Sequence, residues 1–187
     1  MANRNSQGFG LIPAGTLGQT PATSGTGKYK IDAGYATTIF QGGAVSSSAG
    51  YIVEGQGTAD NPMVGVLNGI FYNAATTLKP TFSNHYVQVT PANSEDIDAF
   101  VFDNPQQQYV VATDDAVAQS GYLETYDMNA SAGSTTTGVS SSTLDIGTTG
   151  ADNKSFRLLR SAEDPENDEN AAFRSVVVVP NLIELQS

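Results

Sequence analysis

The amino-acid sequence predicts an all-β protein, a compact antiparallel β-barrel or β-sandwich with an extended N-terminal arm and at most short helices. Two observations lead to this class. The chain of 187 residues holds 19 glycines, 17 serines and 19 threonines, all of them mediocre or poor residues for a helix interior. Its apolar residues recur in short runs, often alternating with polar residues, and turn-forming residues separate these runs, as in antiparallel sheets.

The first segment, residues 1–27, is expected to be an extended arm rather than a helix or a central strand. Six glycines and two prolines interrupt it, and both residue types disfavour those structures. Its apolar side chains have two interpretations, because they can bury against a partner surface or pack on the arm's own domain. The candidate partner contacts in this arm are Phe9, Leu11, Ile12, Pro13 and Leu17.

Residues 28–187 are expected to form a single β-rich domain. Within it, the long apolar run 63–72 contains Gly65 and Gly69, and a glycine inside a strand marks a bulge, a bend or a close backbone approach. The run 176–179 is apolar on both faces, so it needs cover on both sides. Strands are expected at 28–32, 37–40, 51–54, 63–72, 86–90, 99–103, 108–113, 122–128, 141–146, 155–160 and 175–179, with a possible extension at 182–185.

Only two segments suggest helix, and both are short. The first is 114–119, and the second is 164–173, where acidic residues crowd the first turn and would favour the helix dipole. The polar stretch 129–142 is of low complexity and predicts an exposed loop.

The charge of the chain is strongly acidic and unevenly distributed. Residues 1–94 hold three acidic and four basic residues, whereas residues 95–187 hold sixteen acidic and four basic, giving a net charge of −11. This acidity argues against nucleic-acid binding, which needs a basic footprint. The split predicts either one solvated acidic side and one docking side, or acids spread over the whole folded surface.

Composition also excludes several kinds of chemistry. The chain has no cysteine and one histidine, which excludes disulfides, thiol catalysis and histidine-rich metal sites. It has neither an apolar run long enough to cross a bilayer nor an N-terminal secretory signal. We therefore expect no membrane partner and synthesis in a reducing cytoplasm.

No candidate catalytic site stands out. The acidic residues at 163–169 offer oxygen ligands for Ca²⁺, but their spacing is not that of an EF-hand loop and a solvated turn is the default. His85 lacks an activated serine in a Gly-x-Ser-x-Gly turn. Exposed aromatic residues could bind sugars, although core packing is their commoner role and the chain has no tryptophan. The sequence thus predicts no enzyme, no cofactor and no metal.

Three segments resemble the small head decoration, or cement, proteins of tailed bacteriophages. After the start Met-Ala-Asn, residues 9–18 read FGLIPAGTLG, which is similar to the "FGLRP" opening frequent in that family. Residues 39–45 read IFQGGAV and residues 63–67 read MVGVL, similar to two strand motifs of the family. The resemblance covers residues 1–72, with a looser match in strand order beyond. Ile12 replaces a frequent arginine and Gly43 a frequent aspartate, so neither side chain supports the resemblance.

The resemblance implies a virion structural protein that binds the outer surface of the phage head and stabilises the capsid. Its partner would be the major capsid protein of the same phage, and the protein would be a homo-oligomer, a trimer or a dimer, made in the host cytoplasm. The alternative is another virion component, such as a tail protein or a receptor- or carbohydrate-binding module.

Overall fold

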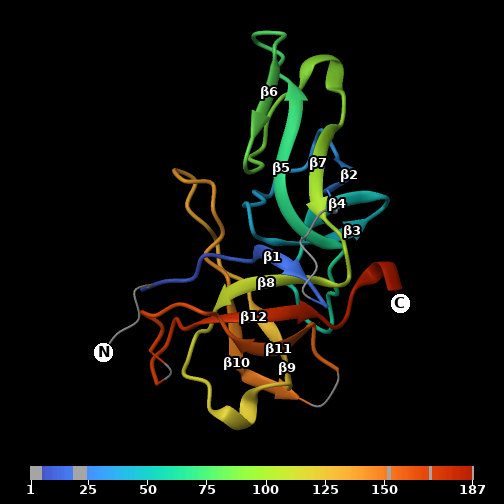
Figure 1. Cartoon of the computed structure of the whole chain (residues 1–187). Coiled ribbons are helices and arrows are strands. Elements are labelled where there is room, and N and C mark those ends of the chain that lie inside the picture. Colours follow the sequence, from blue (N-terminus) through green and yellow to red (C-terminus); the bar gives the residue numbers. More distant parts are fainter. Residues whose placement is uncertain (1–5, 19–24, 151–152, 169, 187) are drawn as a thin grey trace.

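The computed structural model describes residues 6–18, 25–150, 153–168 and 170–186. It confirms the all-β class: two antiparallel sheets pack in a sandwich-like arrangement rather than a closed barrel (Figure 1). Sheet A runs in the order β1 (Ile12–Thr16), β8 (Gln107–Ala112), β12 (Ser175–Pro180), β11 (Phe156–Ser161), β9 (Thr125–Asn129) and β10 (Thr143–Gly150). Sheet B runs in the order β2 (Gly27–Ile31), β7 (Ile97–Phe102), β5 (Gly65–Asn73), β3 (Ala44–Ser48) and β4 (Tyr51–Glu54), and β6 (Pro80–Ser83) pairs with β5.

The structure has two hydrophobic cores, one on sheet A, to which Ala44 and Val66 of sheet B also contribute, and one on sheet B. The core of sheet A contains alternate residues of its central strands, among them Tyr109, Val111 and Val178. The core of sheet B forms around Ile31, Leu67 and other inward residues. β12 is central in sheet A and Val176, Val177, Val178 and Val179 are all buried, which confirms that this run needs cover on both faces.

The glycines of β5 mark a close approach and a bulge, as the sequence predicts. A side-chain carbon at Gly65 would overlap the backbone oxygen of Phe102 on β7. The register between β5 and β7 shifts between Leu67 and Gly69, and a bulge of this kind bends the strand that carries it. The bend is visible in the curved β5 of Figure 1.

The two expected helices are wrong. The described residues of 164–173 and residues 114–118 are turns, bends or irregular backbone, and Gln119 begins a 3₁₀ turn. The three helical segments found among the described residues are single 3₁₀ turns, η1 (Ala92–Ser94), η2 (Gln119–Gly121) and η3 (Glu184–Gln186). Polar side chains explain the difference, because they bond to backbone groups and so compete with helix formation. Asn167 accepts a bond from the N–H of Ser175 at 2.9 Å and donates to its carbonyl at 2.8 Å.

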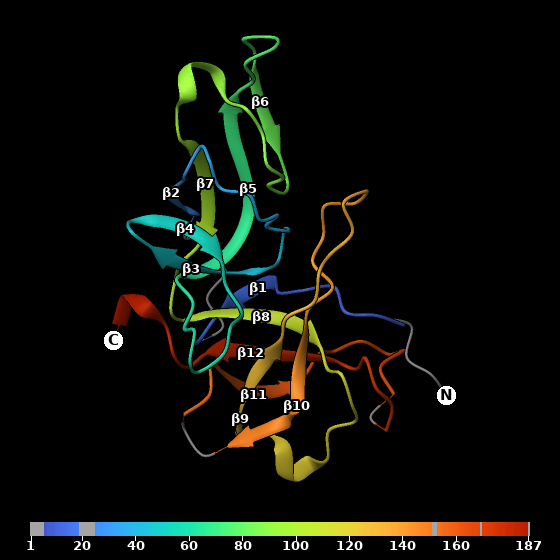
Figure 2. The ribbon, with the colours of Figure 1, turned by 180° about the vertical axis from the view of Figure 1, so that it is seen from behind.

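The loop between β9 and β10 stands beside sheet B in both ribbon views (Figure 2). It is largely exposed over 130–137, as expected, but Ser140 and Ser142 are buried. Gln41 donates its N–H to the carbonyl of Gly138 at 2.9 Å, and the amide of Asn84 donates to the carbonyl of Thr137 at 2.8 Å. The loop of sheet A thereby contacts sheet B through hydrogen bonds.

Candidate binding surface

The N-terminal segment is part of the fold over residues 6–18, whereas the expected arm also includes residues 1–5 and 19–24, which lie outside the described residues. Leu11 is 1% exposed and belongs to the core of sheet A. The expectation that Leu11 is a partner contact is therefore wrong for this conformation. Its side chain joins the arm to its own domain, which was the second interpretation of the arm's apolar residues.

The other candidate contacts remain accessible. Residues 12–16 form β1, an edge strand of sheet A that pairs only with β8 and has an irregular register between Pro13 and Gly15. Pro13 is tolerated there because an edge strand has one unpaired side. Ile12 is 50% and Leu17 is 41% exposed, Pro13 is exposed, and Phe9 is half-buried.

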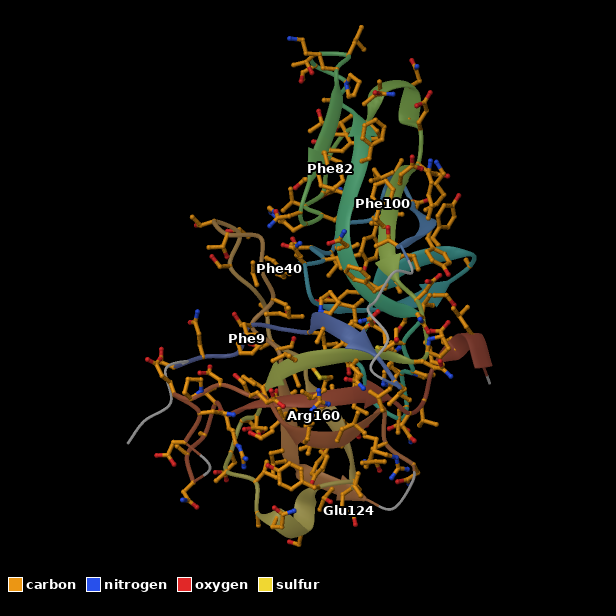
Figure 3. The ribbon with its side chains drawn as sticks, viewed as in Figure 1. Phe9, Phe40, Phe82, Phe100, Glu124 and Arg160 are labelled. Atoms are coloured by element: carbon orange, nitrogen blue, oxygen red, sulfur yellow. The ribbon has the colours of Figure 1, made fainter. Side chains whose placement is uncertain are left out.

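An apolar cleft of about 260 Å³ lies beside these residues. It is bordered by Phe9, Ile12 and Pro13 on one side and by Leu67 and Phe102 of sheet B on the other. Figure 3 shows Phe9 next to β1, at the level where the two sheets meet. The cleft and the exposed edge of β1 form one surface, which we call the N-terminal surface.

The three sequence motifs that carry the family resemblance meet behind this surface. The N–H of Leu11 donates to the carbonyl of Gly42 at 2.8 Å, and the N–H of Gly42 donates to the carbonyl of Leu67 at 2.9 Å. Gly42 has a φ of 77°, which favours glycine. Motifs far apart in the sequence thus form one hydrogen-bonded unit that supports the exposed β1.

A second apolar surface lies on the outward face of sheet B, and the sequence analysis missed it. Along β7, Ile97, Ala99 and Val101 point into the core of sheet B, so Asp98 and Phe100 lie on the other face. In most sheets with one covered face such positions are polar, but here Phe100 is one of them. We define the aromatic face by the phenylalanines that share this side: Phe71, Phe82 and Phe100. Phe102, at the end of β7, instead packs against the core of sheet A.

The aromatic face is open to solvent at its end nearest β6. Phe82 is 64% exposed, and its ring lies 6.0 Å from that of Phe100, centroid to centroid. Figure 3 shows both rings on the part of sheet B that projects away from sheet A. The sequence signal was available, because Asp98 and Phe100 alternate with the buried residues of β7.

An ion-pair cluster of two lysines and one aspartate lies at the flank of this face. Lys28 and Lys30 of β2 place their ammonium nitrogens 2.7 and 2.6 Å from the carboxylate oxygens of Asp98. Burial acts to raise the pKa of Asp98, but the hydrogen bonds from both lysines outweigh it, so the pKa lies below its ordinary value. A lowered pKa means that this cluster stabilises the fold at neutral pH and loses that contribution as the pH falls through the pKa.

The residues considered for chemistry do not assemble into a reaction centre. Within the described ranges, no three or more His, Asp or Glu side chains come together as a metal site. His85 stacks on Phe40 at 6.1 Å, and its Nδ1 is 2.9 Å from the side-chain oxygen of Asn84. These contacts give His85 a structural role at the junction with the β9–β10 loop. The part of the chain that the structure describes holds no helix suited to span a membrane.

Comparison of the chain with protein-family models, with curated proteins and with solved structures finds no match in any of the three. The class of protein must therefore be argued from the fold and its surfaces. They define an all-β sandwich with exposed apolar patches: five of the seven large apolar side chains that are exposed in the described chain belong to residues 1–94.

Proposed function

We propose that this protein is a non-enzymatic virion component that binds the outer surface of a phage head and stabilises the capsid. The observation that carries the proposal is the convergence of the three family-like motifs, 9–18, 39–45 and 63–67, into one backbone-bonded unit behind β1. That unit presents Ile12 and Leu17 to solvent, and exposed apolar side chains of this size on an acidic chain are suited to docking.

The N-terminal surface is the proposed contact with the major capsid protein. Phe9, Ile12, Pro13 and Leu17 supply apolar groups, while Leu11 holds the segment on its own domain. Because residues 6–18 are already ordered, binding through them costs less conformational entropy than ordering a free arm would.

Stabilisation would follow from mass action. A protein that binds the assembled shell but not its separated subunits shifts the equilibrium towards the shell. Repeated contacts of an oligomer on a symmetric lattice add avidity without further contacts in each copy.

A second candidate is a carbohydrate- or receptor-binding module of the virion. One observation favours it: a hollow of about 290 Å³ on sheet B is lined by Phe71, Tyr72, Asn73 and Asp96, among others. Aromatic faces and hydrogen-bonding side chains together can bind sugars. Selective binding on a glycan array, without affinity for heads, would favour this function over decoration.

The proposed function is tested by sedimenting the protein with expanded, undecorated heads of its own phage. We expect saturable pelleting at a fixed molar ratio to the major capsid protein, because a symmetric shell offers a fixed number of equivalent sites. We also expect decorated heads to withstand higher temperature than bare heads before releasing DNA. Absence of pelleting at all protein concentrations would contradict decoration.

A further inference from the structure

The turn of the β5–β6 hairpin holds a large apolar residue at a position that favours glycine. Leu78, between the two strands, is 73% exposed and has a φ of 52°. The left-handed backbone conformation is sterically unfavourable for leucine but not for glycine. A leucine side chain that stays exposed also contributes no hydrophobic stabilisation to the monomer. The backbone conformation alone does not distinguish this leucine, since other residues of the chain share it; what distinguishes it is the company of further exposed apolar side chains, which marks interaction surfaces.

The hairpin also belongs to the part of the chain that lacks acidic residues. Residues 61–94 contain no aspartate or glutamate, although the chain carries a net charge of −11. Besides Leu78, this stretch exposes Phe82 (64%) and Val87 (37%). Since copies of an acidic protein repel one another through their acidic surfaces, a hairpin whose own residues carry no acid is a region where two copies can approach. Glu95 and Asp96 lie beside it, in the hollow next to β5.

The end of the hairpin has charges of both signs. An isolated bridge pairs Ala74 with Pro91, which brings the loop that follows Pro91 beside the end of the hairpin. Lys79 lies in the hairpin and Glu95 in that loop, and both are exposed. Neither forms an ion pair among the described residues. In a two-fold symmetric dimer the same patch of both copies meets itself, so the patch must carry both the positive and the negative partner of each ion pair. This patch carries both.

We propose that the β5–β6 hairpin is a docking site for a second copy of this chain. Leu78 and Phe82 bury against their symmetry mates, and Lys79 of each copy pairs with Glu95 of the other. The surface is separate from the N-terminal surface, so this inference does not depend on binding to a phage head.

Leu78→Gly tests the proposal without risking the fold. Glycine relieves the left-handed backbone, so the monomer should unfold at the same temperature as wild type or higher. Wild type should show a concentration-dependent dimer in sedimentation equilibrium, and the variant should raise its dissociation constant about tenfold or more, because buried anchors dominate interfaces.

The chain offers a matched control in Leu123. It is 62% exposed and has a φ of 67°, but it lies next to Glu124, at the end of the molecule away from the hairpin (Figure 3). Leu123→Gly should leave the dissociation constant unchanged. An equal effect of Leu78→Gly and Leu123→Gly would overturn the proposal.

A charge swap tests the orientation of the two copies. Lys79→Glu should weaken the dimer about two- to fivefold, the range for an exposed ion pair, and Lys79→Glu combined with Glu95→Lys should restore it. Failure of the double variant to recover would contradict the proposed pairing. A wild-type protein that sediments as a monomer throughout, yet loses head binding on Leu78→Gly, would show that the shell occupies this surface instead.

Discussion

Replacing Gly65 with valine is expected to destabilise the protein by about 3 kcal/mol or more, because the added side chain would meet backbone, which cannot move aside as a flexible side chain can. A carbon added at Gly65 overlaps the backbone oxygen of Phe102 and also crowds a methyl group of Val101. Both neighbours belong to β7, so the insertion must separate β5 from β7 and disrupt the pairing on which sheet B depends.

The free energy of unfolding, measured by urea titration with circular dichroism, checks this expectation. Gly25→Ala is the matched control, since a carbon at Gly25 meets no atom within 4 Å and its φ is not positive. That variant should lie within about 0.5 kcal/mol of wild type, as surface substitutions usually do. A comparably small loss for Gly65→Val would mean that β5 and β7 are not as close as described.

Leu11→Ala is expected to lower the free energy of unfolding by about 2–5 kcal/mol, the usual cost of truncating a fully buried leucine. Leu11 is 1% exposed and packs in the core of sheet A. The loss should appear in the same titration, and it would establish that the N-terminal segment is a structural part of the domain.

Leu123→Ala is the control for this prediction, because the side chain of Leu123 is 62% exposed and its removal leaves no cavity. A cost for Leu11→Ala no larger than that of Leu123→Ala would contradict the integration of the segment into the core. If the prediction holds, deleting residues 2–20 removes a core leucine and an edge strand together. Such a deletion cannot separate loss of binding from loss of folding.

The fold class was predictable because alternation of apolar and polar residues is a local signal. The expected strand at 28–32 is found as β2, and the runs at 51–54 and 63–72 are found as β4 and β5. The apolar run in 175–179 is found as β12. Each of these strands has apolar side chains that face a core, so its apolar pattern can be recognised without knowing which strands lie beside it.

Other strands depend on their partners and were missed. β3 is rich in serine, and β6 begins with Pro80 and pairs only with β5, so neither has a clear pattern of its own. Conversely, the expected strands at 37–40 and 86–90 reduce to one bridge between Ile39 and Tyr86. β3 and β6 are held by hairpin pairing with the neighbouring strands β4 and β5, and the bridge between Ile39 and Tyr86 by a pairing distant in sequence. In each case the backbone partner decides the structure, and the propensity of the segment alone does not encode it.

The candidate site was predictable only in part. The sequence identified the apolar residues of the N-terminal segment, but not that Leu11 faces the domain's own core while Ile12 faces solvent. That division follows from the pairing of β1 with β8. Predicting the aromatic face would have required knowing which side of β7 is covered by the core. The alternation of Phe100 with the buried residues of this strand was the available signal.

The most direct test of the account compares head binding by wild type with that of the double variant Ile12→Ser, Leu17→Ser. Both side chains are about half exposed, so the variant should fold normally, as its melting temperature will show. Leu123→Ser, at a side chain that is more exposed (62%) but distant from β1, is the control. We predict that the double variant's affinity for expanded heads falls about tenfold or more, while the control pellets like wild type. Undiminished binding by the folded double variant would contradict attachment through the N-terminal surface.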